Sequence, residues 1–369
     1  MSKSQELPDI RVYKKGDELG YIALMNLVFP RYKCDIKRWR WEYADNPFGS
    51  IQVFADFAGN IIGHMGLIFI PIKIGDRIFL GSQAVDLAVH PSFRGRGIFL
   101  QIGKKLMQEA AEKGILISYG VPNEPAYRGH LKYGWFFVSK IPVLIKPITK
   151  KGLTMFILVN FLGFIKKPTL ESIFYILTSF KNAIVESLKT KSETAQFCND
   201  YKVNALASFD GKIDILWEKA SQKYSLIVAR NTKYLNWRYV EKPHSRYIIL
   251  TITKDQEIEG YIVLSITHGL LNLKKGYIVD LLAISKRSAH CLLNLAFEFF
   301  AKEKVDSITC WAMERNILYN SLIERGFLND YFSPAKLICR INTDDNVFEK
   351  YYRNFEKKWY FTIGDSDIV

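Results

Sequence analysis

The chain has 369 residues, of which 49% are hydrophobic and 24% are charged, and its formal net charge is +14. This apolar fraction excludes an intrinsically disordered chain, and the length exceeds what one hydrophobic core usually serves, so we expect two domains. The excess of basic residues indicates an anionic partner, but it does not distinguish a phosphorylated cofactor from acidic lipid or nucleic acid.

The five cysteines are scattered along the chain and include no Cys-x-x-Cys pair. This pattern predicts neither a disulfide framework nor a zinc site, and we expect no resident metal. The first residues, MSKSQELPDIRVYKKGDE, lack the apolar segment of a secretory signal peptide. A reducing cytoplasm is therefore the expected location.

The same order of elements occurs twice along the chain. Trp-x-Tyr-x-x-x-Pro segments stand at residues 41–47 and 237–243. Each precedes two strands joined by a turn, a strand carrying Asp86 or Asp280, an amphipathic helix, a short strand and a second helix. A strand, a crossover helix and a further strand predict local parallel pairing inside a mixed sheet. We therefore predict an α/β fold with two tandem domains, 1–146 and 204–341.

The segments outside the two repeats have their own patterns. Residues 147–203 are predicted to be mostly helical, and residues 342–369 to form a strand and then an acidic tail, GDSDIV. We expect this tail to be solvated. The alternative is that Asp365 and Asp367 fold back to hold an ammonium group. The apolar run 153–165 is too short to span a bilayer. Lysine pairs on both sides of it would suit a membrane interface, whereas a buried helix between the domains is the favoured interpretation.

A basic, glycine-bearing turn interrupts the first repeat between a strand and a helix. The segment reads LAVHPSFRGRGIF, with Arg94, Gly95, Arg96 and Gly97 at the turn. A strand, a glycine turn and a helix N-terminus present backbone N–H groups toward one point, where the positive end of the helix dipole adds to them. The pattern predicts an anion-binding site. It matches neither the GxGxxG dinucleotide motif nor a Walker loop.

This segment resembles the acetyl-CoA-binding segment of the GNAT superfamily of N-acetyltransferases, whose pattern is Arg/Gln-x-x-Gly-x-Gly/Ala. Arg94 and Gly97 match the fixed positions, while Phe99 stands where the family has a small residue. PNEPAYRGHLKYGW resembles the family's closing helix. The resemblance implies that the coenzyme pyrophosphate binds the turn and that the pantetheine arm follows the preceding strand. The coenzyme-binding residues it implies are Leu87, Ala88, Val89, Arg94, Gly95, Arg96, Gly97, Ile98, Phe99 and Asn123.

Attack on a thioester uses a neutral amine, and a proton donor assists the departing thiolate. His130 stands where the family often has the donor tyrosine, four residues before Gly134, and it is either this acid or a surface histidine. Tyr127 is the nearby alternative.

Asp86, in the strand beside the expected reaction centre, is the candidate base. A structural role is the alternative, because Asp280 occupies the same place in the second repeat. Glu124 and His90 are weaker candidates. Trp39, Arg40 and Glu124 are the predicted substrate contacts. The aromatic residues of the two repeated Trp-Tyr segments are instead expected to pack helices on sheets.

The second repeat reads DLLAISKRSAHC, with no glycine between Asp280 and the following helix. Side chains there would prevent a close backbone approach, so we predict one coenzyme site and a degenerate second domain. The arrangement resembles tandem, mycothiol synthase-like acetyltransferases.

The predicted function is acetyl-CoA-dependent transfer of an acetyl group to a small-molecule amine, such as an amino sugar or glycan precursor. One alternative is aminoacyl transfer resembling the Fem-type enzymes, which use charged tRNA; we expect no nucleic acid because the glycine turn is intact. Another is a non-catalytic acyl-CoA-binding module, with peripheral membrane contact through residues 153–165. The sequence leaves the amine, the acyl chain length and the oligomeric state open.

Overall fold

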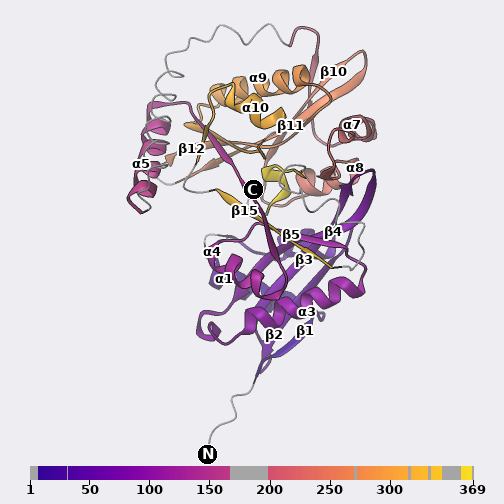
Figure 1. The fold of residues 1–369 in the computed structure, drawn as a ribbon, viewed down its shortest axis with the longest axis vertical. Helices are drawn as coiled ribbons and strands as arrows, with labels where there is room; N and C mark the ends of the chain where they lie inside the picture. The colour runs from indigo at the N-terminus through magenta and orange to yellow at the C-terminus, as the bar shows by residue number, and fades with distance from the viewer. Residues whose placement is uncertain are drawn as a thin grey trace, which may run out of the picture. The chain divides into compact units, whose positions relative to one another are not determined.

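The computed structural model describes residues 7–30, 32–166, 198–269, 272–314, 317–330, 334–342 and 359–367. The chain forms two compact units, each built from separate segments (Figure 1). Unit 1 contains Met1–Ser139, Asn236–Ser245 and Lys336–Arg353. Unit 2 contains Lys140–Leu235, Arg246–Ala335 and Asn354–Val369.

The sheet of unit 1 has the strand order β1-β2-β3-β4-β5-β15-β6. Its strands are β1 (Asp9–Val12), β2 (Ser50–Phe57), β3 (Asn60–Ile74), β4 (Arg77–Val89), β5 (Ile117–Gly120), β6 (Phe136–Ile141) and β15 (Ala335–Ile341). Its helices are α1 (Asp17–Val28), α2 (Ile36–Trp39), α3 (Ile98–Glu112) and α4 (Glu124–His130), and a π-helical turn, Arg40–Ala44, follows α2. The β4–β5 pair is parallel, as the crossover helix α3 requires.

The core of unit 1 lies between α3 and the sheet. Ile98, Ile102, Leu106 and Ala110 line one face of α3 and pack with Met65 and other side chains of β2 and β3. Their spacing of four residues places them on one stripe of the helix, which is why the amphipathic pattern predicts it.

The sheet of unit 2 has the order β14-β7-β13-β12-β11-β10-β8. Its strands are β7 (Val143–Pro147), β8 (Lys202–Leu206), β10 (Tyr247–Lys254), β11 (Glu257–His268), β12 (Lys274–Ala283), β13 (Ser307–Trp311) and β14 (Leu328–Asn329). The helices are α5 (Lys150–Lys166), α7 (Lys212–Ser221), α8 (Thr232–Leu235), α9 (Lys286–Lys302) and α10 (Ile317–Ile323). A short strand, β9 (Leu226–Val228), pairs in parallel with β16 (Trp359–Tyr360).

The two repeats have the same strand and helix order except for β9, which stands between α7 and α8 and has no counterpart in the first repeat. Both sheets are mixed, so the predicted α/β class is confirmed. The internal similarity extends to an irregularity in the long hairpin of each sheet. The register of β3 with β4 shifts beside Asp86, whose φ is 53°, and the register of β11 with β12 shifts beside Asp280.

The units do not coincide with the contiguous stretches 1–146 and 204–341, because each repeat supplies a strand to the other sheet. β7, from the end of the first repeat, pairs with β13 and β14. β15, from the end of the second repeat, pairs with β5. Each of these strands covers the backbone edge of the short strand on which it pairs, and hydrogen bonding along that edge accounts for the exchange.

The C-terminal residues are buried in unit 2, so the expectation of a solvated acidic tail is wrong for residues 359–366. The side chain of Asp365 is fully buried and forms an ion pair of 2.6 Å with Arg230. Thr362 Oγ1 donates to Asp280 Oδ1 over 3.1 Å. A buried carboxylate needs such a partner, and the sequence pattern does not identify a partner more than a hundred residues away.

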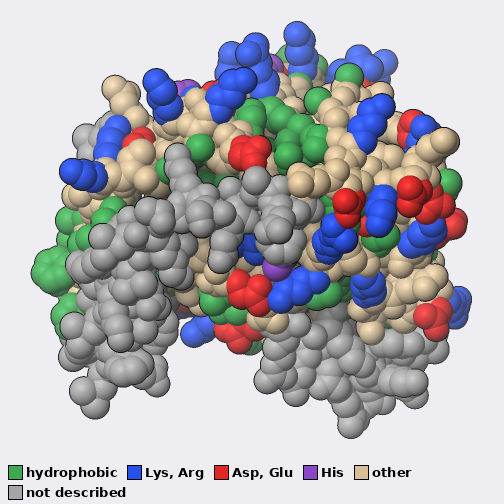
Figure 2. Space-filling model, turned by 90° about the horizontal axis from the view of Figure 1, so that it is seen from above, with side chains coloured by type: hydrophobic (Ala, Val, Ile, Leu, Met, Phe, Trp, Pro, Cys, Tyr) green, Lys and Arg blue, Asp and Glu red, His purple; other side chains and the backbone are tan. Residues whose placement is uncertain are grey.

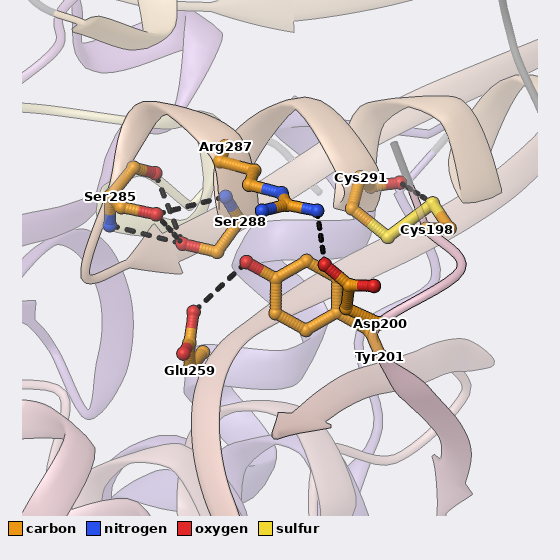
Figure 3. Close-up of a disulfide and its surroundings, with 8 residues drawn as sticks. All are labelled: Cys198, Asp200, Tyr201, Glu259, Ser285, Arg287, Ser288 and Cys291. Carbon is orange, nitrogen blue, oxygen red and sulfur yellow. Dashed lines mark hydrogen bonds and ion pairs between the residues drawn. A yellow bond between two sulfur atoms is a disulfide. The ribbon is translucent and has the colours of Figure 1, made fainter. Parts of the chain in front are cut away.

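A disulfide joins Cys198 to Cys291 on α9, so the prediction of no disulfide is wrong for this pair (Figure 3). Beside it, Arg287 of α9 pairs with Asp200, and the Tyr201 hydroxyl donates to Glu259 over 3.0 Å. The bond closes a loop across a sequence separation of 93 residues. The cysteine spacing therefore gives no support to a reducing location.

The disulfide is expected to stabilise unit 2. Cys198→Ser should lower the free energy of unfolding by about 2–4 kcal/mol, because the open chain regains the entropy of this loop. Urea unfolding measures the difference. The comparison variant is Cys310→Ser, at a buried cysteine outside the disulfide. A reducing agent should lower the free energy of unfolding of the native chain and leave that of the Cys198→Ser variant unchanged. Equal stability of the native chain with and without reductant would contradict this prediction.

Candidate active site

The glycine turn of unit 1 is an exposed backbone cradle at the start of α3. Gly95 and Gly97 have φ values of 78° and 77°, in the left-handed region. A Cβ on Gly95 would meet no atom within 4 Å, and one on Gly97 would approach only Gln101 Nε2, at 4.0 Å. Gly97 is the N-cap of α3 and provides no side-chain cap. The first N–H groups of α3 therefore face open space that a Cβ would fill.

The two arginines of the turn are held along its sides. Arg94 Nε donates to the Val89 carbonyl over 3.2 Å, and an Arg96 amino group donates to the Ser92 carbonyl over 3.2 Å. Both side chains remain exposed and keep further N–H donors. The turn thus combines backbone amides, the positive end of α3 and two permanent charges, a combination that fits a pyrophosphate.

Strands β4 and β5 diverge just before this turn. Their parallel pairing consists of Ser82 with Ser118 and Gln83 with Tyr119, while β4 continues to Val89. Gln83 lies at this last rung, is 3% exposed, and has an amide nitrogen with no partner among the described residues. A buried donor therefore lies at the last paired rung of the two strands, next to the part of β4 where the sequence predicts the pantetheine arm.

The predicted coenzyme residues on β4 and α3 differ in their surroundings. Leu87 and Val89 are half-buried against the core below α3, and Ala88 points to the other face opposite His64. Ile98 is buried in that core. Phe99 packs its ring edge-on against His130 and Tyr133. Its side chain therefore belongs to the packing of α3 on α4, which explains a large residue at this position.

Asn123 and Glu124 stand at the start of α4. Asn123 Oδ1 accepts from the Ala126 amide over 3.0 Å, so its side chain caps the helix. Glu124 is exposed and forms ion pairs with Lys336 and Arg128. Its hydrogen bond to Lys336 lowers the pKa of Glu124, which makes it a weaker base.

Asp86 lies at the centre of a buried polar cluster. Its carboxylate accepts from the hydroxyls of Tyr21 and Tyr43 over 2.5 and 2.9 Å. The Arg38 guanidinium lies 3.5 Å away and also pairs with Glu42. Burial raises the pKa of Asp86, but Arg38 and the hydrogen bond from Tyr21 outweigh it, so the pKa is lowered overall. A carboxylate with a lowered pKa is a poor proton acceptor. The partners of Asp86 come from α1, from α2 and from the π-helical turn that follows α2.

His64 belongs to the same cluster, and sequence analysis missed it. Its Nδ1 lies 2.9 Å from the Asp86 carbonyl, and its ring is fully buried beside Tyr21 and Phe54. A donating Nδ1 leaves Nε2 as an acceptor, and Nε2 has no partner among the described residues. The sequence pattern HMG in a strand carries no signal that would distinguish His64 from a solvent-facing histidine.

His130 is 4% exposed, so it is not a surface histidine. Its Nδ1 lies 2.5 Å from the Tyr133 hydroxyl, and Phe99 and Trp135 flank its ring. Burial lowers the pKa of His130 to about 4. The pKa of His130 therefore lies below the value of about 6.5 that the sequence suggests, and its ring is neutral at neutral pH.

Two buried histidines make unit 1 sensitive to acid. The pKa values of His64 and His130 fall from 6.5 to about 4 on folding, whereas in the unfolded chain both protonate near 6.5. Their contribution to stability is complete above about pH 6.5 and is lost as the pH falls to about 4, by up to about 3 kcal/mol for each ring. Urea unfolding at a series of pH values measures this loss.

The matched variants are His130→Phe and His268→Gln, the latter at an exposed histidine. His130→Phe should reduce the slope of stability against pH, and His268→Gln should leave it unchanged. A slope that His130→Phe does not alter would show that this ring titrates alike in both states.

Trp39 and Arg40, the predicted substrate contacts, differ in their exposure to solvent. Trp39 is 7% exposed, and its indole N–H donates to Gln52 Oε1 over 3.0 Å, so it is a core residue. Arg40 is exposed and pairs loosely with Asp45 at 3.4 Å. Burial removes Trp39 from substrate contact in this structure.

The two repeated tryptophans pack on each other within unit 1. Trp41 and Trp237 stack with ring centroids 5.1 Å apart, and each indole N–H donates to the backbone carbonyl of the other. Both tryptophans therefore have the packing role that the sequence predicts, but each ring packs on the tryptophan of the other repeat.

The second repeat has no comparable cradle. Ser285 caps α9 through its side chain and forms a capping box with Ser288, which satisfies amides at the helix start (Figure 3). The Tyr360 hydroxyl donates to the carbonyl of Leu281, which follows Asp280 as Leu87 follows Asp86. The C-terminal segment thus binds the backbone of β12 directly after Asp280.

A cavity of about 490 Å³ lies beside the glycine turn in unit 1. It is lined by α1 residues, the β2–β3 turn, and His90 and Phe93 at the end of β4. His90 Nδ1 accepts from the Ser92 amide, so this histidine caps the short turn that leads to Arg94. No group of three or more His, Cys, Asp or Glu residues in the described ranges is placed to hold a metal ion.

Comparison with known proteins addresses the fold. Residues 9–137 match the family described as "Acetyltransferase (GNAT) domain". Comparison with curated proteins gives no match.

Three solved structures cover most of the chain. A conserved Enterococcus faecalis protein of unknown function, described as a probable N-acyltransferase, has a TM-score of 0.63 at 13% identity, over 94% of this chain and 75% of that one. A GCN5-related N-acetyltransferase from Anabaena variabilis has a TM-score of 0.62 at 13% identity, over 91% of this chain and 73% of that one. The N-myristoyltransferase of Saccharomyces cerevisiae, with bound myristoyl-CoA, has a TM-score of 0.57 at 11% identity, over 92% of this chain and 81% of that one. The chain has the GNAT fold, and residues 9–137 match the GNAT acetyltransferase domain.

Proposed function

We propose that this protein is an acyl-CoA-dependent N-acyltransferase with one coenzyme site, in unit 1, and that acetyl-CoA is its acyl donor. The observation that carries the proposal is the open cradle of Gly95 and Gly97 at the start of α3, on the connection from β4 to β5. The match of residues 9–137 to the acetyltransferase domain supports it. We expect the acceptor to be a small-molecule amine, with an amino sugar or glycan precursor as the first class to test.

The residues of the turn would hold the pyrophosphate through the amides that follow Gly97 and through Arg94 and Arg96. In the proposed complex the backbone of β4 at Leu87–Val89 binds the pantetheine arm by main-chain hydrogen bonds, beside the bond that the Val89 carbonyl accepts from Arg94. The coenzyme supplies an activated acyl group as a thioester. In the reaction the amine nitrogen bonds to the carbonyl carbon, the carbon–sulfur bond breaks, the amine loses a proton and the thiolate gains one.

We assign to Asp86 a positioning role rather than that of the base, because its carboxylate already binds Tyr21, Tyr43 and Arg38. Asp280 has an equivalent set of partners, including Tyr261 and Arg230, in the repeat without a cradle. A role common to both repeats is structural: it fixes the irregular strand beside the opening.

Tyr127 remains the candidate proton donor to the thiolate. It is half-buried at the α4 side of the core, and the Lys336 ammonium lies 4.4 Å from the centre of its ring. Tyr127→Phe should lower kcat by about 100-fold with little change in KM, since a proton donor acts in the transition state. The comparison is Tyr32→Phe, which keeps the ring whose centre lies 3.8 Å from the Arg38 guanidinium and should leave kcat unchanged. Equal kcat values for Tyr127→Phe and the native chain would remove Tyr127 from the mechanism.

The test of the function is release of free thiol from acetyl-CoA in the presence of an amine panel, with myristoyl-CoA as a second donor. The proposal requires acetyl-CoA to raise the melting temperature of the protein and one amine class to accelerate thiol release. If neither coenzyme stabilises the protein, the proposal fails; if the coenzyme binds without turnover on any amine, the non-catalytic alternative replaces it.

A further inference from the structure

Helix α5 is attached to unit 2 by one narrow face. Gly152, Phe156 and Asn160, spaced four residues apart, are its buried positions. A Cβ on Gly152 would lie 1.9 Å from the carbonyl oxygen of Asp306, and Thr149 Oγ1 donates to Asp306 Oδ1 over 2.7 Å just before the helix begins. This contact fixes the helix start against unit 2 and determines which face is left outward.

The outward face of α5 is a continuous apolar stripe, so the predicted buried helix between domains is wrong for it. The spacing of the exposed positions, i, i+1, i+3, i+4 and i+7, places them on one side of a helix. They are Leu158 (44% exposed), Val159 (42%), Phe161 (52%), Leu162 (49%) and Ile165 (58%). Figure 2 shows hydrophobic side chains gathered at the left-hand edge, on the side where α5 lies in Figure 1. A contiguous patch of this kind marks an interaction surface.

The charges of the helix determine what that surface can bind. In the sequence, Lys150 and Lys151 begin the helix, Lys166 ends it and Lys167 follows, and no acidic residue lies between them. Lys150 is exposed, and Lys151 Nζ binds the Asn272 carbonyl over 2.9 Å. Two copies of α5 facing each other, in either direction, would bring lysines against lysines. An anionic surface has the opposite sign and would attract the exposed Lys150 at the start of the helix.

We propose that the apolar stripe of α5 docks on a bilayer surface that contains anionic lipid. Among the described helices, none is long and apolar enough to cross a membrane. The stripe would enter the boundary between headgroups and acyl chains, while Lys150 contacts phosphates. This inference is independent of the proposed acyltransferase activity, since it concerns a surface of unit 2 and needs neither coenzyme nor amine.

The test is sedimentation of the full chain with vesicles of phosphatidylcholine, with or without about 30% phosphatidylserine. We expect binding to the anionic vesicles that weakens as salt rises. Phe161→Ser with Leu162→Ser should weaken this binding at least about tenfold, because it removes buried apolar area. Lys150→Gln should weaken it about fivefold.

The matched control is Ile215→Ser, an equally exposed apolar residue, at 51%, on helix α7 of the same unit. It should leave vesicle binding unchanged, and thermal unfolding should be alike for all variants, since every substituted side chain is exposed. The inference is overturned if the native chain stays in the supernatant with anionic vesicles, or if the double variant binds as the native chain does. It is also overturned if, without lipid, the native chain dimerises and the double variant does not, which would assign the stripe to a second copy.

Discussion

Gly97→Glu is expected to abolish the stabilisation of this protein by acetyl-CoA and to lower kcat/KM for thiol release by at least about 100-fold. A side chain at this position fills the open space at the start of α3, and its carboxylate repels a pyrophosphate. At least two hydrogen bonds to a charged group would be lost, each contributing about 1.5–3 kcal/mol. A thermal shift with and without coenzyme measures binding, and a thiol assay measures turnover.

The control for Gly97→Glu lies at the other end of the same helix. Gly114 also has a left-handed backbone, with φ of 71°, and a Cβ there would meet no atom within 4 Å. Gly114→Glu therefore introduces the same charge and the same backbone strain away from the turn. It should keep the response to acetyl-CoA. Gly97→Gln fills the same space without the charge, so it separates the steric effect of the side chain from its repulsion of the pyrophosphate. A full coenzyme response in Gly97→Glu would show that the turn does not bind the phosphates.

Arg230→Ala is expected to destabilise unit 2 by about 3–5 kcal/mol, because it leaves two buried carboxylates without their cation. Arg230 is fully buried, with Asp365 at 2.6 Å and Asp280 at 3.4 Å. Burial raises the pKa of Asp365 even though Arg230 opposes it, so losing the arginine raises that pKa further. The destabilisation should therefore be largest at neutral pH and smaller toward about pH 4, where a carboxyl can fold in its neutral form. Urea unfolding at both pH values tests this.

Two further variants distinguish charge from packing at Arg230. Adding Asp280→Asn and Asp365→Asn to Arg230→Ala should recover part of the lost stability, since neutral amides tolerate burial better than unpaired carboxylates. Arg128→Ala removes an exposed arginine whose pair with Glu124 is solvent-accessible, and it should change stability by less than about 1 kcal/mol. Equal losses for the single and triple variants would show that packing, and not charge, dominates.

The clusters around Asp86 and Asp280 indicate how the two repeats have diverged. In unit 1 the carboxylate is held by tyrosines and an arginine from helices. In unit 2 the C-terminal segment supplies Thr362 and Asp365, and Tyr360 binds the adjacent backbone. The irregular strand is therefore held by helix side chains in the first repeat and by the C-terminal segment in the second.

Local patterns in the sequence determined much of this protein. The stripe Ile102, Leu106 and Ala110 predicts α3, the paired Trp-x-Tyr-x-x-x-Pro segments predict the internal repeat, and Gly95 with Gly97 predicts a backbone cradle that the structure shows open. These features depend on residues within one or two turns of each other. Helical periodicity and the freedom of glycine at positive φ are properties of the local chain, so they can be predicted without tertiary contacts.

Only the tertiary structure decided the surroundings of single side chains. Asp86 binds Tyr21, 65 residues away in the sequence, and Asp365 binds Arg230, 135 residues away in the sequence. His130 acquires a low pKa because aromatic rings from other segments exclude water from it, and β7 and β15 leave their own repeats for the sheet that offers a free edge. Burial and pairing depend on which distant segments meet, and no local pattern determines that meeting.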